Sequence, residues 1–275
     1  MEDKNTKYFH QRASQRQSKD HIHGFLDETV RWCTYEPNID RVAESYFQNL
    51  FTLSNPTNLE VVLNSVDKVV TLDMNHTLFQ PYTPDEEKNA LFSMHPSKLP
   101  GPDGISPFFF QKYWHIVGTD VTNVILSVLH SNHFLHNMSY TPIVLIPKIN
   151  EPKSVSDYRP ISLGNVVSRI VSKVLANRLK LILPNVISNS QSAFVPNWLI
   201  IHNIVVAFKV LQRMRNKRIG KKGQMAIKLD INKAYERVEW VFLQKIMLKL
   251  GFDDRWVHLA IEMVHTATYS VLING

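Results

Sequence analysis

The chain has 275 residues, of which 44% are hydrophobic and 20% are charged, and its mean hydropathy is −0.16. This composition excludes a disordered chain, and the length supports one large hydrophobic core or two moderate ones. The single cysteine, Cys33, excludes an internal disulfide framework and favours a reducing compartment. The polar N-terminus lacks the apolar segment of a signal peptide, and the longest apolar stretch, 198–208, is too short to span a bilayer, so we expect an intracellular protein.

The formal net charge of +7 is unevenly distributed along the chain. The segment 148–222 holds fourteen basic and only two acidic residues, whereas the rest of the chain is net acidic. A polyanion such as a nucleic acid is the expected partner of this basic third. The alternative is a set of solvated basic helix faces with no nucleic-acid role.

The N-terminal part of the chain is predicted to be mainly helical. Apolar residues at helical spacing predict a helix over 38–52, with Asp40 as its N-cap. A second helix is predicted over 83–94, where Thr83 is a good N-cap, Pro84 suits the first helical position and the acidic residues that follow favour the positive helix end.

A loop and a run of aromatic residues come next. The stretch Pro-Gly-Pro-Asp-Gly at 100–104 predicts a shaped loop, because prolines restrict φ and glycines permit positive φ. The aromatic residues after it could stack on nucleic-acid bases, but their helical spacing favours a place in the core. They are Phe108, Phe109, Phe110, Tyr113 and Trp114.

The remainder alternates strands with long helices. Residues 141–148 predict a buried strand that ends at Pro147, and residues 159–184 predict a long helix with one apolar and one basic face, stopped by Pro184. The basic face is assigned Arg169, Lys173, Arg178 and Lys180. Further predicted elements are a helix over 199–215, a basic turn over 216–224, a strand over 225–231, helices over 238–252 and 255–265, and a strand over 269–275. This order indicates an α+β fold.

Five stretches, in this order and covering the chain nearly end to end, resemble the reverse transcriptases of plant non-LTR (LINE-type) retrotransposons. They are "KNTKYFHQRASQR", "PGPDGISPFFFQKYW", "PIVLIPKINEPKSVSDYRPISLGNVVSRIVSKVLANRLK", "QSAFVP" and "MAIKLDINKAYERVEW". The resemblance implies a partial right-hand polymerase. It would comprise an N-terminal mainly helical region (1–80), a fingers-like region (81–224) and the first part of a palm (225–275). It also implies an RNA template, a DNA primer, dNTP substrates, Mg²⁺ and a nuclear location.

The resemblance also implies roles for single residues. Asp230 looks like the catalytic, metal-binding aspartate, Ile231 like the donor of a backbone carbonyl to the same metal, and Tyr235 like the aromatic gate beneath the incoming sugar. Lys148 and Arg159 look like the pair that grips the triphosphate. The residues then expected to contact nucleic acid are Arg169, Lys173, Lys217, Arg218, Lys221 and Lys222.

The chemistry of these residue types suits those roles. Mg²⁺ takes carboxylate and phosphate oxygens, and phosphoryl transfer needs positioning and neutralisation of charge more than covalent chemistry. Arg159 can hold phosphate bidentately, whereas Lys148 acts as a point charge. Without the resemblance, the two cations would be ordinary surface residues, Tyr235 a core aromatic and Asp230 the cap of a strand end.

One carboxylate cannot hold two metal ions, so Asp230 needs a partner. Strand alternation sends Glu236 to the opposite face, and Asp253 and Asp254, between two predicted helices, are better explained as an N-cap and a dipole partner. Glu239 and Glu262 are the other downstream acids. We therefore expect the second catalytic carboxylates beyond Gly275, and a chain that is inactive by itself.

Two other hypotheses remain open. The chain could be a non-catalytic RNA- or DNA-binding relic that uses the basic region 148–222. It could also be an unstable relic without activity. Departures from the family pattern at Asn197, Trp198, His202 and Glu236 would fit a decayed copy of an element.

Overall fold

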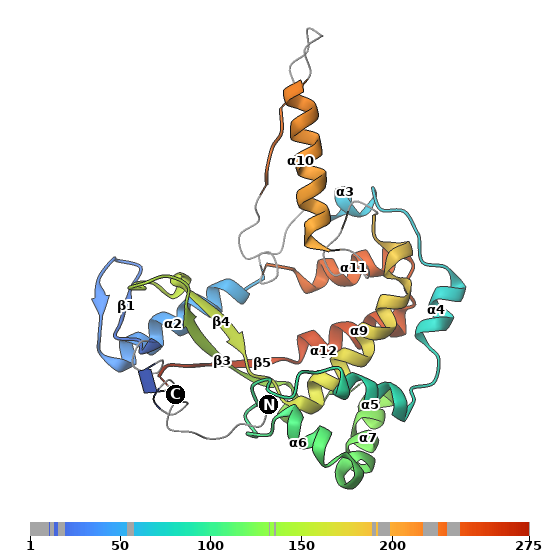
Figure 1. Ribbon diagram of the computed structural model, residues 1–275, viewed down its shortest axis with the longest axis horizontal. Coiled ribbons are helices and arrows are strands. Elements are labelled where there is room, and N and C mark those ends of the chain that lie inside the picture. The colour runs from blue at the N-terminus through green and yellow to red at the C-terminus, as the bar shows by residue number, and fades with distance from the viewer. Residues whose placement is uncertain are drawn as a thin grey trace.

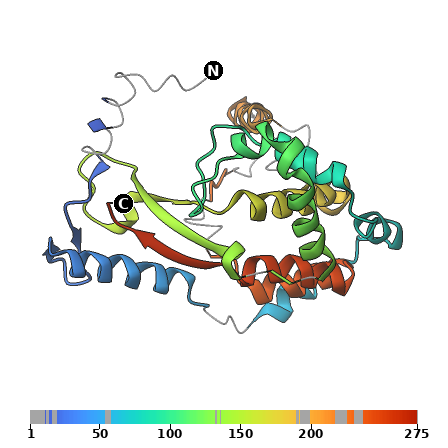
Figure 2. The same ribbon diagram turned by 90° about the horizontal axis from the view of Figure 1, so that it is seen from below.

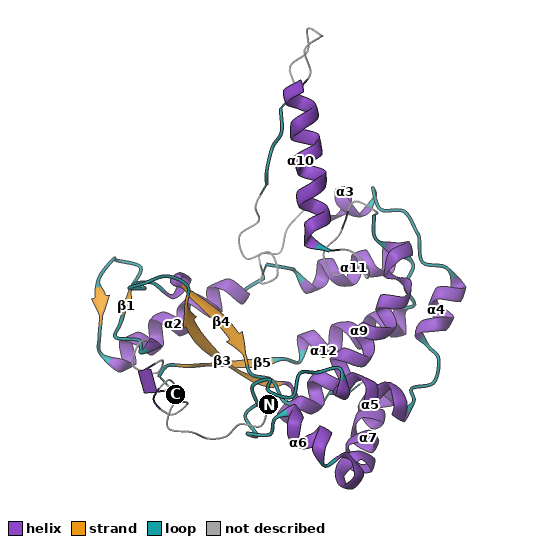
Figure 3. Ribbon diagram, viewed as in Figure 1, coloured by secondary structure: helices purple, strands orange, loops and turns teal. Residues whose placement is uncertain are grey.

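Two groups of elements, each with its own hydrophobic core, make up the fold (Figure 1). The structure is a computed structural model. It describes residues 11, 14–15, 20–53, 58–131, 133–134, 136–188, 191, 199–216, 225–229 and 237–274. Figure 3 shows the strands gathered at one side of the molecule and most of the helices at the other. Both cores include residues from the N-terminal, middle and C-terminal thirds, and the domain boundaries at 80/81 and 224/225 stay predictions.

The first group contains a sheet of three strands. Its strands are β3 (Tyr140–Pro147), β4 (Tyr158–Ser162) and β5 (Thr268–Leu272), and a hairpin of β1 (Phe25–Leu26) and β2 (Trp32–Cys33) lies beside them. The order is β4-β3-β5, with β4 antiparallel and β5 parallel to the central strand. The strands predicted over 141–148 and 269–275 are therefore confirmed, including the end of the first at Pro147.

The helix predicted from residue 159 begins later than expected. Residues 159–162 belong to β4, and the helix α9 spans Val166–Val186. Arg159 precedes Pro160, which restricts it to extended backbone, and a proline is tolerated in β4 because that strand is at the edge of the sheet. Pro184 also does not stop α9: it lies in the last turn, and the helix continues to Val186.

The helix α2 (Glu36–Phe51) covers one face of the sheet, as Figure 2 shows. Its residues Ile39, Ala43 and Phe47 recur every four positions and are buried in the core that also contains Ile143 and Tyr158. The predicted helix is confirmed, but Asp40 is not its N-cap. Pro37 stands in the first turn and Tyr35 at the N-cap position, so Asp40 lies inside the helix.

The second group is helical and is built around α9. Besides α9 itself, five described helices contribute buried residues to its core: α4 (Leu72–Leu78), α5 (Pro84–Phe92), α6 (Pro107–Lys112), α7 (Trp114–Ser131) and α12 (Asp254–His265). Partly buried side chains of α11 (Trp240–Leu250) and α8 (His136–Ser139) pack against it. Thr83 and Glu86 form a complete capping box at the start of α5, which confirms the predicted N-cap.

The aromatic run after the Pro-Gly loop is only partly in the core. Phe110 is buried and Trp114 packs against the helical core, but Phe108 is 52% exposed and Phe109 and Tyr113 are also exposed. The prediction of core positions was wrong for these three residues. The ammonium of Lys112 lies 5.6 Å from the ring centroids of both Phe108 and Tyr113, a cation–π arrangement that suits rings at the surface.

The described residues before and after the predicted basic turn are mostly exposed. The helix predicted over 199–215 is confirmed as α10 (Ile200–Asn216), which projects away from the rest of the molecule in Figure 1 and carries exposed apolar side chains such as Phe208. Residues 225–229 form no strand, contrary to the prediction, and Leu229 is 86% exposed. A strand needs a partner for its backbone groups, and the described strands offer 225–229 none. Most of the predicted basic turn, 217–224, lies outside the described residues.

The two C-terminal helices were predicted correctly. Gly251, with φ of +100°, ends α11 in a left-handed conformation, and Asp253 caps α12. A short helix, α3 (Leu59–Leu63), and a 3₁₀ turn, η1 (Val155–Asp157), complete the described elements. None of the described helices combines the length and the apolar character that crossing a bilayer requires.

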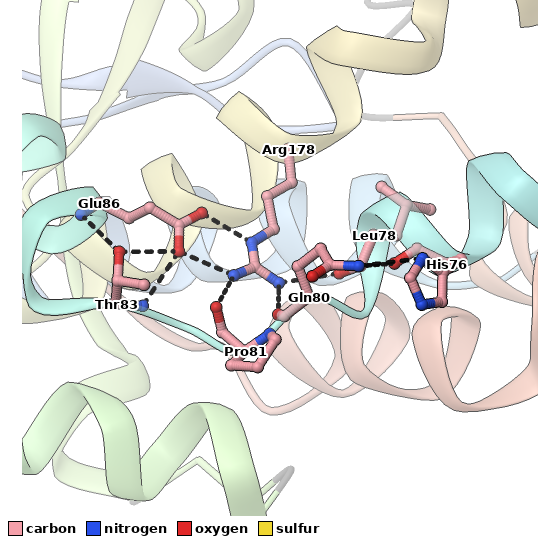
Figure 4. Close-up of polar contacts among 7 residues, drawn as sticks. All are labelled: His76, Leu78, Gln80, Pro81, Thr83, Glu86 and Arg178. Carbon is pink, nitrogen blue, oxygen red and sulfur yellow. Dashed lines mark hydrogen bonds and ion pairs between the residues drawn. The ribbon is translucent and has the colours of Figure 1, made fainter.

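A buried arginine fixes α9 against the segment that joins α4 to α5 (Figure 4). Arg178 is 4% exposed, and all five of its N–H donors are used. Nε and Nη2 bind the carboxylate of Glu86 at 2.8 and 2.7 Å, and the remaining hydrogen bonds reach three main-chain carbonyls. Those carbonyls belong to Leu78, Gln80 and Pro81. The prediction that Arg178 belongs to the basic outer face of this helix was therefore wrong.

Substitution of Arg178 tests this role. We expect Arg178→Met to lower the free energy of unfolding by about 3–5 kcal/mol, because it leaves a carboxylate and three carbonyls without their donor. Lys180→Met removes the same charge from an exposed position two residues later. It should change the free energy of unfolding by no more than about 0.5 kcal/mol. Urea denaturation of both variants makes the comparison, and equal effects would contradict the structure.

Glu86 and Glu87 are neighbours whose pKa values are shifted in opposite directions. The Arg178 guanidinium holds the pKa of Glu86 below its ordinary value, so the stabilisation by this pair is lost as the pH falls through that lowered pKa. Glu87 is fully buried, and the Thr122 side chain offsets only part of the cost of burying its carboxylate. Burial raises its pKa from 4.5 to about 7. Its contribution is therefore favourable below pH 4.5 and is lost as the pH rises through about 7.

Glu87→Gln should remove the loss of stability that ionisation of Glu87 causes at high pH. At pH 8 we expect the variant to be more stable than the parent by up to about 3 kcal/mol, the free energy of a shift of roughly two and a half pKa units. At pH 4 both side chains are neutral and the difference should largely vanish. Thermal unfolding at the two pH values measures it. Asp85→Asn, on the exposed face of the same helix, is the matched control, and a gain at pH 8 that persisted at pH 4 would contradict the assignment.

Candidate functional site

The hairpin of β3 and β4 places Lys148 and Arg159 on one face. Arg159 is paired with Ile146 across the two strands, and the N–H of Lys148 donates to the carbonyl of Asp157 at 2.8 Å, which extends the pairing beyond β3. Because side chains alternate along a strand, Ile146, Lys148 and Arg159 share a face, whereas Leu145 and Tyr158 point into the core. Diagonal neighbours of this kind are roughly 7–8 Å apart.

Both cations are exposed, and their surroundings differ. The Lys148 ammonium donates to the main-chain carbonyl of Ser156 at 3.0 Å, across the loop that joins the two strands. Arg159 lies on the edge strand of the sheet, where its guanidinium can reach a ligand that approaches from solvent. Two cations on one face, one of them with a planar fork of donors, can bind a polyphosphate at two points.

The Pro-Gly loop closes on the start of α9. Arg169 donates from Nη1 to the carbonyl of Leu99 at 2.9 Å, and burial lowers the pKa of Arg169. A side chain at Gly101 would overlap Asn165, and Gly104 has a φ of +70°, so both positions require glycine. The predicted shaped loop is confirmed. Arg169 supports this loop, and its predicted contact with nucleic acid, like that of the half-buried Lys173 one turn later, stays a prediction.

Asp230, Ile231 and Tyr235 lie outside the described residues, and so does the basic turn with Lys217, Arg218, Lys221 and Lys222. Within the described ranges, no three His, Cys, Asp or Glu side chains lie together in a way that could hold a metal ion. The described residues therefore offer a metal no set of ligands, and the roles given to these seven residues stay predictions.

Asp253, one candidate for a second catalytic acid, has a structural role. Its carboxylate accepts the N–H of Arg255 at 3.0 Å as the N-cap of α12 and forms an ion pair with the Arg255 side chain at 3.1 Å. Arg255 lowers the pKa of Asp253, and the Asp253 N–H donates to the Asn75 side chain at 2.9 Å. The prediction of an N-cap is confirmed, with Asp254 in the first turn near the positive helix end.

The sequence held one pattern that would have placed Arg178 correctly. The buried residues Val171, Val174 and Leu175 continue to Arg178 and then to Ile182 at steps of three or four, so Arg178 lies on the apolar stripe of α9. A charged residue within such a stripe indicates a buried partner. The partner in the structure is Glu86, whose position in the first turn of α5 by itself indicates only a favourable charge at a helix end.

Comparisons with known proteins agree with part of the resemblance found in the sequence, and the plant origin stays a prediction. Residues 146–274 match the family model described as reverse transcriptase (RNA-dependent DNA polymerase). The chain is 29% identical, over 84% of its length, to the Transposon TX1 uncharacterized 149 kDa protein of Xenopus laevis. It is 30% identical, over 39% of its length, to the Retrovirus-related Pol polyprotein from type-2 retrotransposable element R2DM of Drosophila melanogaster. The aligned parts span 18% and 10% of these two relatives. The family match thus covers the C-terminal part of the chain, and both relatives are named as proteins of transposable elements.

Proposed function

We propose that this chain forms the nucleotide-gripping part of a reverse transcriptase, and that Lys148 and Arg159 bind the triphosphate of an incoming dNTP. The observation that carries the proposal is the shared exposed face of these two cations, which the register of β3 and β4 produces. Both lie inside the stretch that matches reverse transcriptases. A polymerase of this family acts on a nucleic-acid template and primer, here proposed to be RNA and DNA, with a nuclear site of action.

The two cations would act through charge. Arg159 can donate two parallel hydrogen bonds to one phosphate, whereas Lys148 contributes a point charge on the same face. Phosphoryl transfer develops charge on the phosphate oxygens, and fixed cations neutralise it without forming a covalent bond. Holding the triphosphate at two points also fixes its direction, which an in-line displacement requires.

Reverse transcriptases are divalent-metal-dependent polymerases, and we propose Mg²⁺ as the metal. Asp230 and the carbonyl of Ile231 would hold it. When bound, the metal would neutralise charge on the reacting phosphates. Among the described residues no three His, Cys, Asp or Glu side chains lie together as metal ligands, and Asp253 is bound to Arg255 and caps α12. The chain by itself is therefore proposed to bind dNTP without extending a primer.

The alternative function is non-catalytic binding of RNA or DNA by the basic region 148–222. The excess of basic residues in this region favours it, as do the exposed cations that α10 carries, among them Lys209 and Arg213. Such binding would weaken steeply with salt and would be indifferent to Asp230. It would be lost when Lys217, Arg218, Lys221 and Lys222 are neutralised together.

Nucleotide binding tests the proposed function. We expect Arg159→Ala to weaken binding of dTTP by about tenfold or more, the usual effect of losing charge-assisted hydrogen bonds. Arg159→Lys should recover only part of the affinity, because an ammonium cannot make the bidentate contact. Equilibrium filter binding with labelled dTTP measures this. Lys88→Ala, an exposed cation on α5, is the control. Equal affinities for Arg159→Ala and Lys88→Ala would overturn the proposal.

Primer extension tests the catalytic part. With an RNA template, a DNA primer, dNTPs and Mg²⁺, we expect no extension by this chain or by its Asp230→Asn variant, because one carboxylate does not hold two metal ions. Extension that disappears in Asp230→Asn would show that the chain assembles the full metal site, which contradicts the predicted inactivity.

A further inference from the structure

The loop between the two proposed phosphate-binding cations is held in place by one carboxylate. Residues 148–157 connect β3 to β4, and a loop of this length would allow its two ends to shift unless its backbone is fixed. Asp157 stands at the end of the loop, directly before Tyr158 and two residues before Arg159. Its Oδ2 accepts the N–H groups of Lys153 at 3.0 Å and of Ser154 at 2.8 Å.

These contacts form a closed arrangement. Ser154 and Asp157 make a reciprocal capping box around the 3₁₀ turn η1, in which each side chain accepts the other's main-chain N–H. The N–H groups of Ser154 and Lys153 hold the pKa of Asp157 below its usual range, so the carboxylate is charged at neutral pH. Hydrogen bonds to a charged acceptor are stronger than those to a neutral one.

The same residue fixes Lys148 through its main chain. The Asp157 carbonyl accepts the Lys148 N–H at 2.8 Å, and the neighbouring carbonyl of Ser156 accepts the Lys148 ammonium at 3.0 Å. Movement of residues 156–157 would therefore move both the backbone and the side chain of Lys148. It would also move Arg159, since only the core residue Tyr158 stands between Arg159 and Asp157.

The outer side of the loop is fixed independently. The N–H of Leu26 in β1 donates to the carbonyl of Lys153 at 2.8 Å. Val155 is buried, and the ring of Phe25 meets that of Tyr158 edge-to-face at 5.5 Å between centroids. Because these contacts do not use the Asp157 side chain, the hairpin core should persist when that side chain is removed.

We infer that Asp157 is a positioning residue for triphosphate binding: it sets the loop so that Lys148 and Arg159 face the nucleotide together. The inference rests on the proposed function of those two cations. A positioning role and simple charge repulsion predict opposite effects on nucleotide affinity when Asp157 is removed. A carboxylate near a triphosphate repels it, so removal of Asp157 would strengthen nucleotide binding if only charge mattered. A positioning role predicts weaker binding.

The test compares dTTP affinity in four full-length proteins: the parent chain, Asp157→Ala, Asp157→Asn and Glu151→Ala. Glu151 lies in the same loop, is exposed and carries the same charge, so Glu151→Ala reports the effect of charge alone. We expect Asp157→Ala to bind dTTP at least about fivefold more weakly, because an affinity change of this size corresponds to the net contribution of roughly one hydrogen bond. Asp157→Asn keeps an acceptor oxygen and should recover part of the affinity, while Glu151→Ala should bind equally well or more tightly.

Hydrogen exchange supplies a second readout that does not depend on the nucleotide. In Asp157→Ala the amides of Lys148, Lys153 and Ser154 should exchange at least about tenfold faster, while those of α9 stay unchanged. Unchanged exchange at these three amides would overturn the inference, and so would dTTP binding as tight as in Glu151→Ala. Arg159→Ala is measured beside them. Affinity that depends on Arg159 but not on Asp157 overturns the inference alone, whereas affinity independent of Arg159 overturns the proposed function and the inference with it.

Discussion

The guanidinium of Arg178 is the contact on which the arrangement of the helical group depends. It gathers the carboxylate of Glu86 and the carbonyls that end α4 and lead into α5, and so fixes α9 against two other helices. An arginine with all five donors used inside a protein is strongly directional, because each lost bond leaves a buried polar group without a partner. The apolar side chains of α9 bury this helix in the core, and the hydrogen bonds of Arg178 fix where along α9 the segment between α4 and α5 is attached.

The position of α9 also affects the proposed nucleotide site, because α9 follows directly after the strand that carries Arg159. The start of α9 follows β4 after three residues and holds the Pro-Gly loop through Arg169. The strand β4 carries Arg159, and its partner β3 leads to Lys148. On the opposite face of the same sheet, α2 covers Ile143 and Leu145. The helix α2 thus supports the strands from behind, and Lys148 and Arg159 are exposed on the other face in the part of the chain that the structure describes.

Local sequence rules predicted the parts of the fold that local chemistry decides. The N-cap of Thr83 and the N-cap of Asp253 each depend on a few neighbouring residues, and both were predicted, as were the two helices that Gly251 separates. The strand at 159–162 was not predicted, because the apolar spacing of the helix continues back to residue 159, although Pro160 restricts Arg159 to extended backbone.

The site was harder to predict, because it depends on pairings between distant residues. The face shared by Lys148 and Arg159 follows from the register of two strands, which no local pattern specifies. Arg178 was assigned to the wrong face, since its partners lie some ninety residues earlier in the chain. Residues 225–229 alternate as a strand would, but a strand also requires a neighbour, and composition does not reveal whether one is present.

The most direct test of the account is to map where a nucleotide lies on the protein. A dNTP that carries a photoreactive aryl azide on its γ-phosphate would be bound to the chain and irradiated, and the modified residues located by mass spectrometry. The account predicts labelling on the hairpin between Ile146 and Ser162, and its loss when unmodified dNTP competes. Labelling that instead falls on α10 or on the helical group, or that unmodified dNTP does not displace, would contradict the assignment of Lys148 and Arg159.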